Sequence, residues 1–329
     1  MKIQNTRCVS FMSAAVFLTV AGCGGSGSGS GDATGRISLG VSDGPVHEAS
    51  KVCVAFNEVE FKSGSDSIVA DLADNVNLLD FQGENAAPLL FNYELPGGDY
   101  QWMRLGVTAN LMGGGGLGND DTTSACQGDE SYIVTPDGVF NLYVPSSAKT
   151  GLKLVGGFTV PAGGSANFTA EFDLMKSVTA PNGLSPDVVL RPTIRLVNNV
   201  EVGTLTGEVS TGLATAIVTD LATETDMACA PSVYVFADGV MPNPIDSDTV
   251  PADPNNPDAI ATAMVNAQVN ELEETEYHYT VGYLLAVDDQ GNTPVNYNVA
   301  FTCDGTTFEP VDGKPVEIFV NELATVDFP

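Results

Sequence analysis

The sequence predicts an all-β protein, with two β-sandwich domains of the immunoglobulin or transthyretin type behind a lipoprotein signal and a flexible tether. Apolar residues recur at every second position in many short segments, as in half-buried strands. Glycine and proline turns separate these segments. Between Gly35 and Asn199 no convincing amphipathic helix is found, although residues 75–91 allow one short turn. Many short strands with such turns are typical of sandwiches and barrels.

The chain begins with a secretory signal. Lys2 and Arg7 precede an apolar run from residue 9 to 21, which is too short to span a bilayer. Val20-Ala21-Gly22-Cys23 resembles the lipobox of bacterial lipoproteins, which implies that Cys23 carries a diacylglycerol and an acylated amine. The alternative is a simple signal peptide cut near Ala21.

A glycine/serine run follows Cys23 and spans a distance on the order of 20 Å as a random coil. Two or more acyl chains anchor a protein stably, so the remainder is expected to be held at a membrane. The resulting divisions are residues 1–22 (signal), 23–34 (lipidated cysteine and tether), 35–199 (first β domain) and 200–329 (second β domain).

The chain is strongly acidic. Its formal charge is −30, and loss of Lys2 and Arg7 with the signal makes it −32. From residue 201 onward the sequence contains 22 acidic residues and one basic residue, Lys314. Nucleic acids and anionic lipid headgroups require basic patches, so they are excluded as partners. A solvated acidic surface explains this charge most simply, and attraction of cations is the alternative.

Four cysteines remain for disulfides, because Cys8 leaves with the signal and Cys23 is lipidated. An even number in an exported protein predicts two disulfides. Three pairings are possible, and only one of them crosses no domain boundary near Asn199. The expected disulfides are Cys53–Cys126 and Cys229–Cys303.

The first domain contains a series of strand candidates. They are residues 37–41, 52–61, 100–107, 132–135, 139–144, 158–160, 166–174 and 188–197. The alternation changes phase after Phe56, which predicts a β-bulge near Asn57. Asp43-Gly44-Pro45 predicts a turn, and so does Leu95-Pro96-Gly97-Gly98-Asp99 before the strand at 100–107.

The clearest strand runs from Ala166 to Leu174. Its even-numbered residues are apolar, whereas Asn167, Thr169, Glu171 and Asp173 alternate with them. This pattern predicts one buried face and one solvated face. Lys153, Lys176, Arg191 and Arg195 are expected to pair with Glu171 and Asp173 on that solvated face, at tenths of a kcal/mol per pair. Convergence of these four cations on an anionic partner is the alternative.

Several spaced segments resemble a known family. They are Asp43-Gly44-Pro45, Gly151-Leu152-Lys153-Leu154 with Gly157-Phe158-Thr159-Val160, Phe168-Thr169 with Phe172-Asp173-Leu174 and Lys176-Ser177, and Leu190-Arg191-Pro192 with Arg195-Leu196-Val197. Residues from about 35 to 199 resemble the bacterial lipoprotein family with domain of unknown function 4382. The resemblance implies a secreted or surface-anchored β domain without an established activity. The loop from Leu111 to Gly128 is longer and richer in glycine than the family pattern.

The strand pattern restarts at Val202. Further strands are expected at residues 233–237, 277–283, 297–303 and 316–320, with a turn at 288–292. Tyr277, Tyr279, Val281 and Tyr283 are expected to share one face. Residues 201–329 resemble, more weakly, the transthyretin-like sandwiches of carboxypeptidase regulatory domains.

Enzyme motifs lack their required context. Gly113-x-Gly115-x-x-Gly118 has the spacing of a dinucleotide-binding site. Such a site requires a helix after the glycines, but the residues that follow lack a helical apolar pattern, and the Asp120 and Asp121 carboxylates would repel the phosphates. Ser146-x-x-Lys149-Thr150-Gly151 would require one lysine to serve two separate motifs of the penicillin-binding enzymes.

The two histidines do not complete a site. His47-Glu48 has Lys51 where a second zinc ligand would stand. His278 alternates with Tyr277 and Tyr279, which predicts a solvent-facing strand residue. We assign no catalytic residues and expect the protein not to be an enzyme.

Acidic loops offer one metal hypothesis. Hard oxygen ligands suit Ca²⁺, and the candidates are Asp120, Asp121, Asp129 and Glu130 in one loop and Asp246, Asp248 and Asp253 in another. No EF-hand spacing is present, so a solvated acidic surface remains the simpler interpretation.

The sequence therefore predicts an envelope protein anchored in a membrane through its N-terminal lipid, and this is the outer membrane if the cell is Gram-negative. It is expected to act as a binding or scaffold module for an envelope protein or polysaccharide. A Ca²⁺-dependent adhesin or carbohydrate-binding module is one alternative. An envelope hydrolase, whose paired carboxylates are hidden among 42 acidic residues, is the other.

Overall fold

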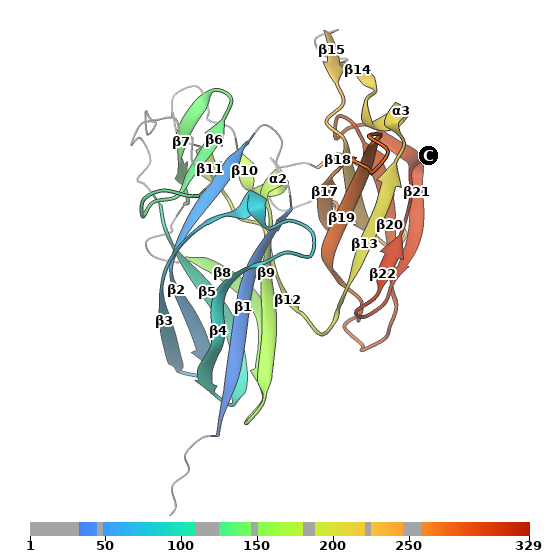
Figure 1. The fold of residues 1–329 in the computed structure, drawn as a ribbon. Helices are drawn as coiled ribbons and strands as arrows, with labels where there is room; N and C mark the ends of the chain where they lie inside the picture. Colours follow the sequence, from blue (N-terminus) through green and yellow to red (C-terminus); the bar gives the residue numbers. More distant parts are fainter. Residues whose placement is uncertain are drawn as a thin grey trace, which may run out of the picture. The chain divides into compact units, whose positions relative to one another are not determined.

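The computed structural model describes residues 33–44, 49–109, 125–145, 151–179, 188–220, 225–245 and 258–329. Residues 33–329 form one compact unit. Nearly all of its regular structure is β-strand (Figure 1), which confirms the all-β prediction.

The part of the chain from residue 34 to 198 contains twelve described strands and two helical turns. They are β1 (Thr34–Gly44), β2 (Lys51–Ser63), β3 (Asp66–Asn77), η1 (Leu78–Asp80), β4 (Ala87–Pro96), β5 (Gly98–Thr108), β6 (Tyr132–Thr135), β7 (Gly138–Tyr143), β8 (Leu152–Val160), β9 (Ser165–Asp173), α2 (Leu174–Ser177), β10 (Val178–Thr179), β11 (Val188–Leu190) and β12 (Ile194–Asn198).

These strands form two sheets. One has the order β12-β9-β1-β4, and the other has the order β10-β11-β7-β6-β2-β5-β8 with β3 paired to β2. Strands β1 and β9 run parallel, whereas β4 and β12 run antiparallel to their neighbours. The parallel pair brings the carboxyl ends of β1 and β9 to the same edge of the first sheet.

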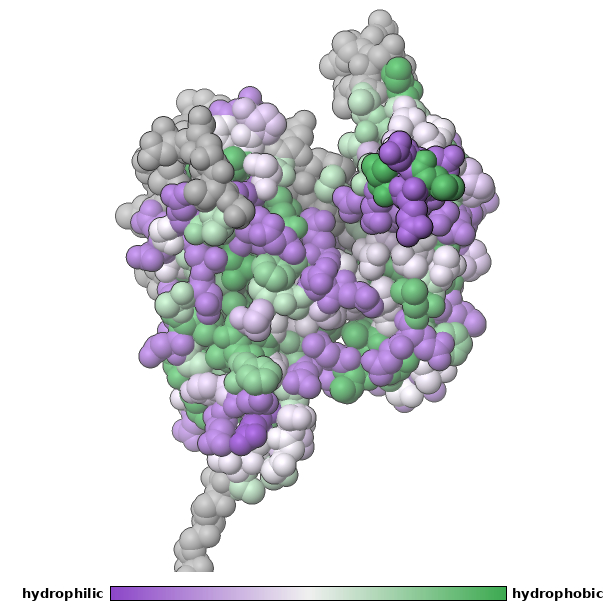
Figure 2. Space-filling model, viewed as in Figure 1, coloured by the Kyte–Doolittle hydropathy of each residue, from purple (hydrophilic) through white to green (hydrophobic). Residues whose placement is uncertain are grey.

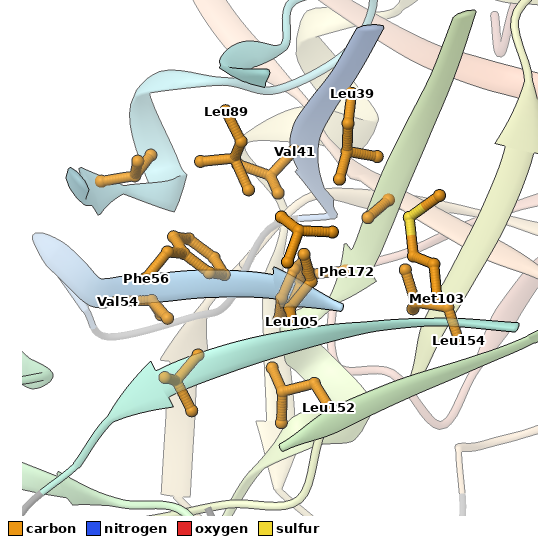
Figure 3. Packing of buried hydrophobic residues seen from close by; sticks show 14 of the residues in the cluster. Leu39, Val41, Val54, Phe56, Leu89, Met103, Leu105, Leu152, Leu154 and Phe172 are labelled. Carbon is orange, nitrogen blue, oxygen red and sulfur yellow. The ribbon is translucent and has the colours of Figure 1, made fainter. Parts of the chain in front are cut away.

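Apolar side chains from the two sheets fill the space between them. Leu39 and Val41 on β1 and Phe172 on β9 lie in one cluster with Val54, Leu105 and Leu152 of the other sheet (Figure 3). Each of these six side chains is buried. Burial of such side chains on folding stabilises the protein by about 1.5–3 kcal/mol each. The packing of two sheets on one core is that of a β-sandwich.

The remaining elements follow in order. They are β13 (Val202–Val209), α3 (Thr211–Ala214), β14 (Ile217–Asp220), β15 (Thr225–Ala228), β16 (Ser232–Ala237), β17 (Ala261–Met264), β18 (Asn266–Val269), β19 (Thr275–Leu285), β20 (Val295–Thr302), β21 (Phe308–Ile318) and β22 (Leu323–Thr325).

Two four-stranded sheets, β18-β19-β13-β22 and β17-β16-β20-β21, enclose a second core. Leu205 of β13, Val235 of β16 and Val299 of β20 are fully buried in it. The two cores comprise residues on either side of 200. The exact domain boundary at 199/200 remains a prediction, because residues 33–329 are one compact unit.

Local sequence signals correspond to the observed elements. The register of β2 shifts between Phe56 and Glu58 against both β3 and β5, which confirms the predicted bulge. The turn at residues 95–99 joins β4 to β5. In the turn at 288–292, the Asp288 carboxylate accepts backbone N–H groups of Gln290 and Asn292. The one short turn allowed within residues 75–91 is η1.

Hydrophilic side chains cover much of the face in Figure 2, and hydrophobic side chains appear among them in patches. Large exposed apolar residues include Phe91 and Leu272, on different halves of the chain. Within the described ranges, no helix has the length and apolarity needed to cross a membrane.

Candidate functional site

Three carboxylates are buried near the carboxyl ends of β1 and β9. The parallel register pairs Asp43 with Phe172 and Gly44 with Asp173, so Asp43, Glu171 and Asp173 lie at one edge of the sheet. Their exposed fractions are 3%, 9% and 8%. Acidic side chains are rarely this buried without a reason in pairing or function.

The predicted turn at Asp43-Gly44-Pro45 is wrong for its first two residues. Asp43 and Gly44 both remain in β1, while Pro45 lies outside the described residues. The backbone N–H of Asp43 donates to the Phe81 carbonyl, and β9 pairs with β1 through Gly44. Long-range pairing therefore overrides the local turn preference and places the Asp43 carboxyl inside the protein.

The solvated face predicted for the strand at 166–174 is wrong for three of its four residues. Asn167 is exposed as predicted, but Thr169, Glu171 and Asp173 are buried. The segment that begins at residue 258 lies against them. Lys176 Nζ donates to the Ala259 carbonyl, and a Cβ added at Gly44 would stand 3.3 Å from Thr262 Oγ1. A segment more than eighty residues away therefore shields this face from water.

Two ion pairs compensate for part of the buried charge. Arg195 on β12 pairs with Glu171, its direct cross-strand neighbour on β9. Lys176 Nζ lies 3.1 Å from Asp173 Oδ2, and Asp173 Oδ1 accepts the backbone N–H of Lys176 at the start of α2. The predicted partners are therefore present, but the pairs lie in a buried setting rather than at a surface.

The three buried carboxylates and their two basic partners, Lys176 and Arg195, are here called the carboxylate cluster. Burial changes the pKa values of two of its members. Desolvation raises the pKa of Glu171 to about 7, although the Arg195 guanidinium opposes the rise. The pKa of Asp43 is raised well above its usual value, first by burial and then by the Asp173 carboxylate, while the Leu174 backbone amide opposes it. Three carboxylates therefore share the cluster with two cations, Lys176 and Arg195, and burial favours the neutral forms of Asp43 and Glu171.

Two cavities adjoin the cluster. The first, here called the carboxylate cavity, has a volume of about 440 Å³ and is lined by Asp43, Asp80, Glu84, Glu171, Thr262 and His278 among others. The second has a volume of about 330 Å³ and contains both ion pairs, Glu171–Arg195 and Asp173–Lys176. Glu171 and Thr262 line both cavities. Such volumes are in the range of small-molecule sites.

Residues 82–85 form one rim of the carboxylate cavity, and two hydrogen bonds to Glu84 hold them in place. Thr204 Oγ1 donates to Glu84 Oε1 at 2.6 Å, and the Tyr283 hydroxyl donates to the Glu84 carbonyl at 2.9 Å. Tyr283 was expected on the same face as Tyr279 and Val281, and this is wrong. Its φ is +54°, and the next residue, Leu284, is buried in the core instead.

Gly282 allows this close approach, because a Cβ there would lie only 2.0 Å from the Gly83 carbonyl oxygen. We expect Gly282→Ala to displace residues 82–85 and to lower the free energy of unfolding by about 1–3 kcal/mol, as overpacking does. Chemical denaturation measures the loss. Gly212→Ala in α3 is the control, since a Cβ there meets nothing within 4 Å. If the two substitutions lowered the free energy of unfolding equally, the tight contact between Gly282 and Gly83 would be contradicted.

Both predicted disulfides are present. The Cα atoms are 5.7 Å apart in Cys53–Cys126 and 4.6 Å apart in Cys229–Cys303. Cys53 is fully buried on β2, beside Tyr132 and Val139. Each disulfide joins segments that belong to the same side of residue 200. Cys23, the predicted lipidation site, lies outside the described residues.

The Ca²⁺ candidates fall largely outside the described ranges. Asp120, Asp121, Asp246, Asp248 and Asp253 lie there, whereas Asp129 and Glu130 are exposed. Among the residues that the structure describes, no group of three histidine, cysteine or acidic side chains has a geometry that could hold a metal ion. The Ca²⁺ hypothesis for the five residues outside the described ranges stays a prediction.

The four basic residues do not converge on one point. Lys176 and Arg195 lie in the buried cluster, whereas Lys153 Nζ stands 4.8 Å from the centre of the Trp102 ring and Arg191 is exposed. His278 is half-buried on β19, with Nε2 3.3 Å from Glu276 Oε2. His47 and the motifs at 113–118 and 146–150 are outside the described residues.

Solved structures offer only distant likenesses. A leucine-rich repeat protein from Bacteroides thetaiotaomicron has 13% identity and a TM-score of 0.21 over 90% of this chain, which spans 26% of that protein's length. A putative adhesin from Bacteroides ovatus has 8% identity and a TM-score of 0.17, with 89% of this chain and 93% of that one covered. No curated protein sequence matches the chain.

A family model does match the part of the chain that carries the carboxylate cluster. It covers residues 34–192 and is described as "Domain of unknown function (DUF4382)". The matched range begins at β1, ends just before β12, and includes Asp43, Glu171, Asp173 and Lys176. Residues 34–192 of this chain therefore belong to the family with domain of unknown function 4382.

Proposed function

We propose that the protein is a lipid-anchored envelope protein that works as a binding module. The observation that carries the binding role is the carboxylate cavity, where Asp43 and Thr262 have buried polar atoms without a hydrogen-bond partner of normal geometry. Native proteins satisfy nearly all buried polar atoms. Unsatisfied atoms that line a cavity point to a ligand that supplies the missing contacts.

The anchoring role is supported by the N-terminal sequence and by the disulfides. Cys23 follows three small or apolar residues and precedes a glycine/serine run, so a lipid on Cys23 would tether the β structure flexibly. Disulfides are stable in oxidising compartments, and this chain has two. The proposed location is the cell envelope, in the outer membrane if the cell has one.

Metabolic labelling tests the anchor. Cells fed labelled palmitate should incorporate it into the wild-type protein and not into Cys23→Ala, because the thiol is the proposed acceptor. Cys8→Ala is the matched control, since Cys8 would be removed with the signal, and its label should equal that of wild type. Equal labelling of wild type and Cys23→Ala would overturn the anchor while leaving the cavity to be judged separately.

A further inference from the structure

We propose that the carboxylate cavity binds an organic cation that carries a primary ammonium or guanidinium group. This inference rests on the proposed binding role and names its class of ligand. It begins from the polar atoms that line the cavity without partners.

Asp43 and Thr262 provide the first argument. Their exposed fractions are 3% and 4%, and neither Asp43 oxygen nor Thr262 Oγ1 has a hydrogen-bond partner of normal geometry, although the Leu174 backbone amide lies near enough to Asp43 to oppose the rise in its pKa. Both residues line the carboxylate cavity. A carboxylate only accepts hydrogen bonds, so the group that satisfies it in the ionised state must donate them. A donor inside this cavity would complete contacts that the protein leaves open.

Charge provides the second argument. Asp43, Asp80, Glu84 and Glu171 line the cavity, and no lysine or arginine is among the described residues that do so. Lys176 and Arg195 line the neighbouring cavity instead. The chain as a whole carries −30. A cation is attracted into such a cavity and an anion is repelled from it.

The remaining choice is between kinds of cation and neutral ligands. In the described part of the chain no set of three histidine, cysteine or acidic side chains could hold a metal ion, which disfavours a bare metal. Tyr279 lines the cavity but is 1% exposed, and its hydroxyl donates to the Val326 carbonyl, so it offers no ring face for stacking a sugar. An ammonium provides three N–H donors and a guanidinium five, as the acceptor-rich lining requires.

Proton exchange distinguishes this site from the acidic surface. Burial and the neighbouring Asp173 carboxylate raise the pKa of Asp43 and so favour its protonated form, whereas a bound cation favours the carboxylate, so binding should be linked to release of a proton. The other groups facing the cavity are Asp80, Glu84 and Glu171, which attract the ligand, and His278, which would repel it when protonated. Affinity should therefore increase as pH rises.

Titration calorimetry on the full-length protein in detergent tests the proposal, with agmatine as the probe because it carries both cationic groups. About 150 mM NaCl screens the exposed charges. We expect one saturable site that binds more tightly at pH 8 than at pH 6. Titrations in two buffers of different ionisation enthalpy should reveal release of up to about one proton per agmatine.

Three variants locate the site. Asp43→Asn keeps the shape of the protonated side chain and should weaken binding by about tenfold or more while abolishing proton release from this group. Thr262→Val removes the unpartnered hydroxyl and should weaken binding severalfold. Asp66→Asn makes the same charge change at an exposed position on β3 and should bind like wild type.

Three results would overturn the proposal. Non-saturable binding is the first and equal weakening by Asp43→Asn and Asp66→Asn is the second, since each would mean general attraction to an acidic chain. The third is binding of a neutral sugar such as maltose without binding of agmatine, which would retain a binding module and reject a cationic ligand. If circular dichroism shows that Asp43→Asn does not fold, the agmatine affinities of Thr262→Val and Asp66→Asn are compared instead. Weaker binding by Thr262→Val alone then supports the proposal, and equal affinities reject it. The palmitate experiment judges the anchor independently.

Discussion

Replacing Cys229 and Cys303 together by alanine is expected to lower the free energy of unfolding by about 4–5 kcal/mol. The two residues are 74 apart in sequence, and opening a loop of that length restores much conformational entropy to the unfolded chain. The disulfide joins the segment before β16 to the end of β20. Denaturation in urea, without reductant, measures the loss against wild type.

The Cys53–Cys126 pair is the matched comparison, because its separation of 73 residues gives the same entropic effect. Cys53 is fully buried, so Cys53→Ala with Cys126→Ala should lose at least as much stability, with a small cavity added to the lost constraint. A loss below about 1 kcal/mol for either pair would contradict the role assigned to that disulfide.

Much of the fold could be predicted because it depends on local patterns. The bulge after Phe56 is visible as a change of phase in the alternation, and the turn at 95–99 as a cluster of proline and glycine. The disulfide pairing followed from where the cysteines stand relative to a change in pattern near Asn199. The first two signals lie within the segments that they describe, and the third depends only on the order of the cysteines along the chain.

The buried cluster could not be predicted from such patterns. Alternation along β9 indicates that Glu171 and Asp173 point away from the sandwich core, and this is correct, but it does not indicate what lies beyond them. Ala259 and Thr262 cover that side, and they are distant in sequence. Asp43 was missed because a local turn signal was given more weight than strand pairing.

One signal could have revealed the cluster. Lys176 follows Asp173 by three residues, and Arg195 stands opposite Glu171 once β12 pairs with β9. The chain has 42 acidic and only 12 basic residues, and two of the basic ones stand beside the acidic residues of this strand. In this cluster the local charge balance, rather than the hydrophobic periodicity, corresponds to the buried site.

The stability of the folded protein should depend on pH through Glu171. Its pKa is about 7 in the folded state and 4.5 ordinarily, because burial disfavours the carboxylate. Between these values the folded protein holds a proton that the unfolded chain releases, so stability is greatest in acid and falls as pH rises from 4.5 to 7. The difference corresponds to roughly 3 kcal/mol.

Glu171→Gln removes this dependence. Glutamine resembles the protonated side chain, so the variant should match wild type near pH 4 and exceed it by roughly 3 kcal/mol at pH 8. Arg195 remains partly hydrated, with 25% of its side chain exposed, and can still donate to the glutamine oxygen. The general repulsion among acidic residues is nearly the same in both proteins, so the difference between their pH curves isolates Glu171.

Glu60→Gln is the control, because Glu60 forms a comparable pair with Arg104 between β2 and β5. Its stability curve gives the effect of neutralising a carboxylate in a cross-strand ion pair that lies outside the buried cluster. Urea denaturation at several pH values measures all three curves.

A lower stability of Glu171→Gln than of wild type at pH 8 would mean that the ion pair with Arg195 outweighs the cost of burying the carboxylate, contrary to the raised pKa. A gain confined to high pH would show that the protein retains this carboxylate at a cost in stability, as expected of a residue kept for binding rather than for folding.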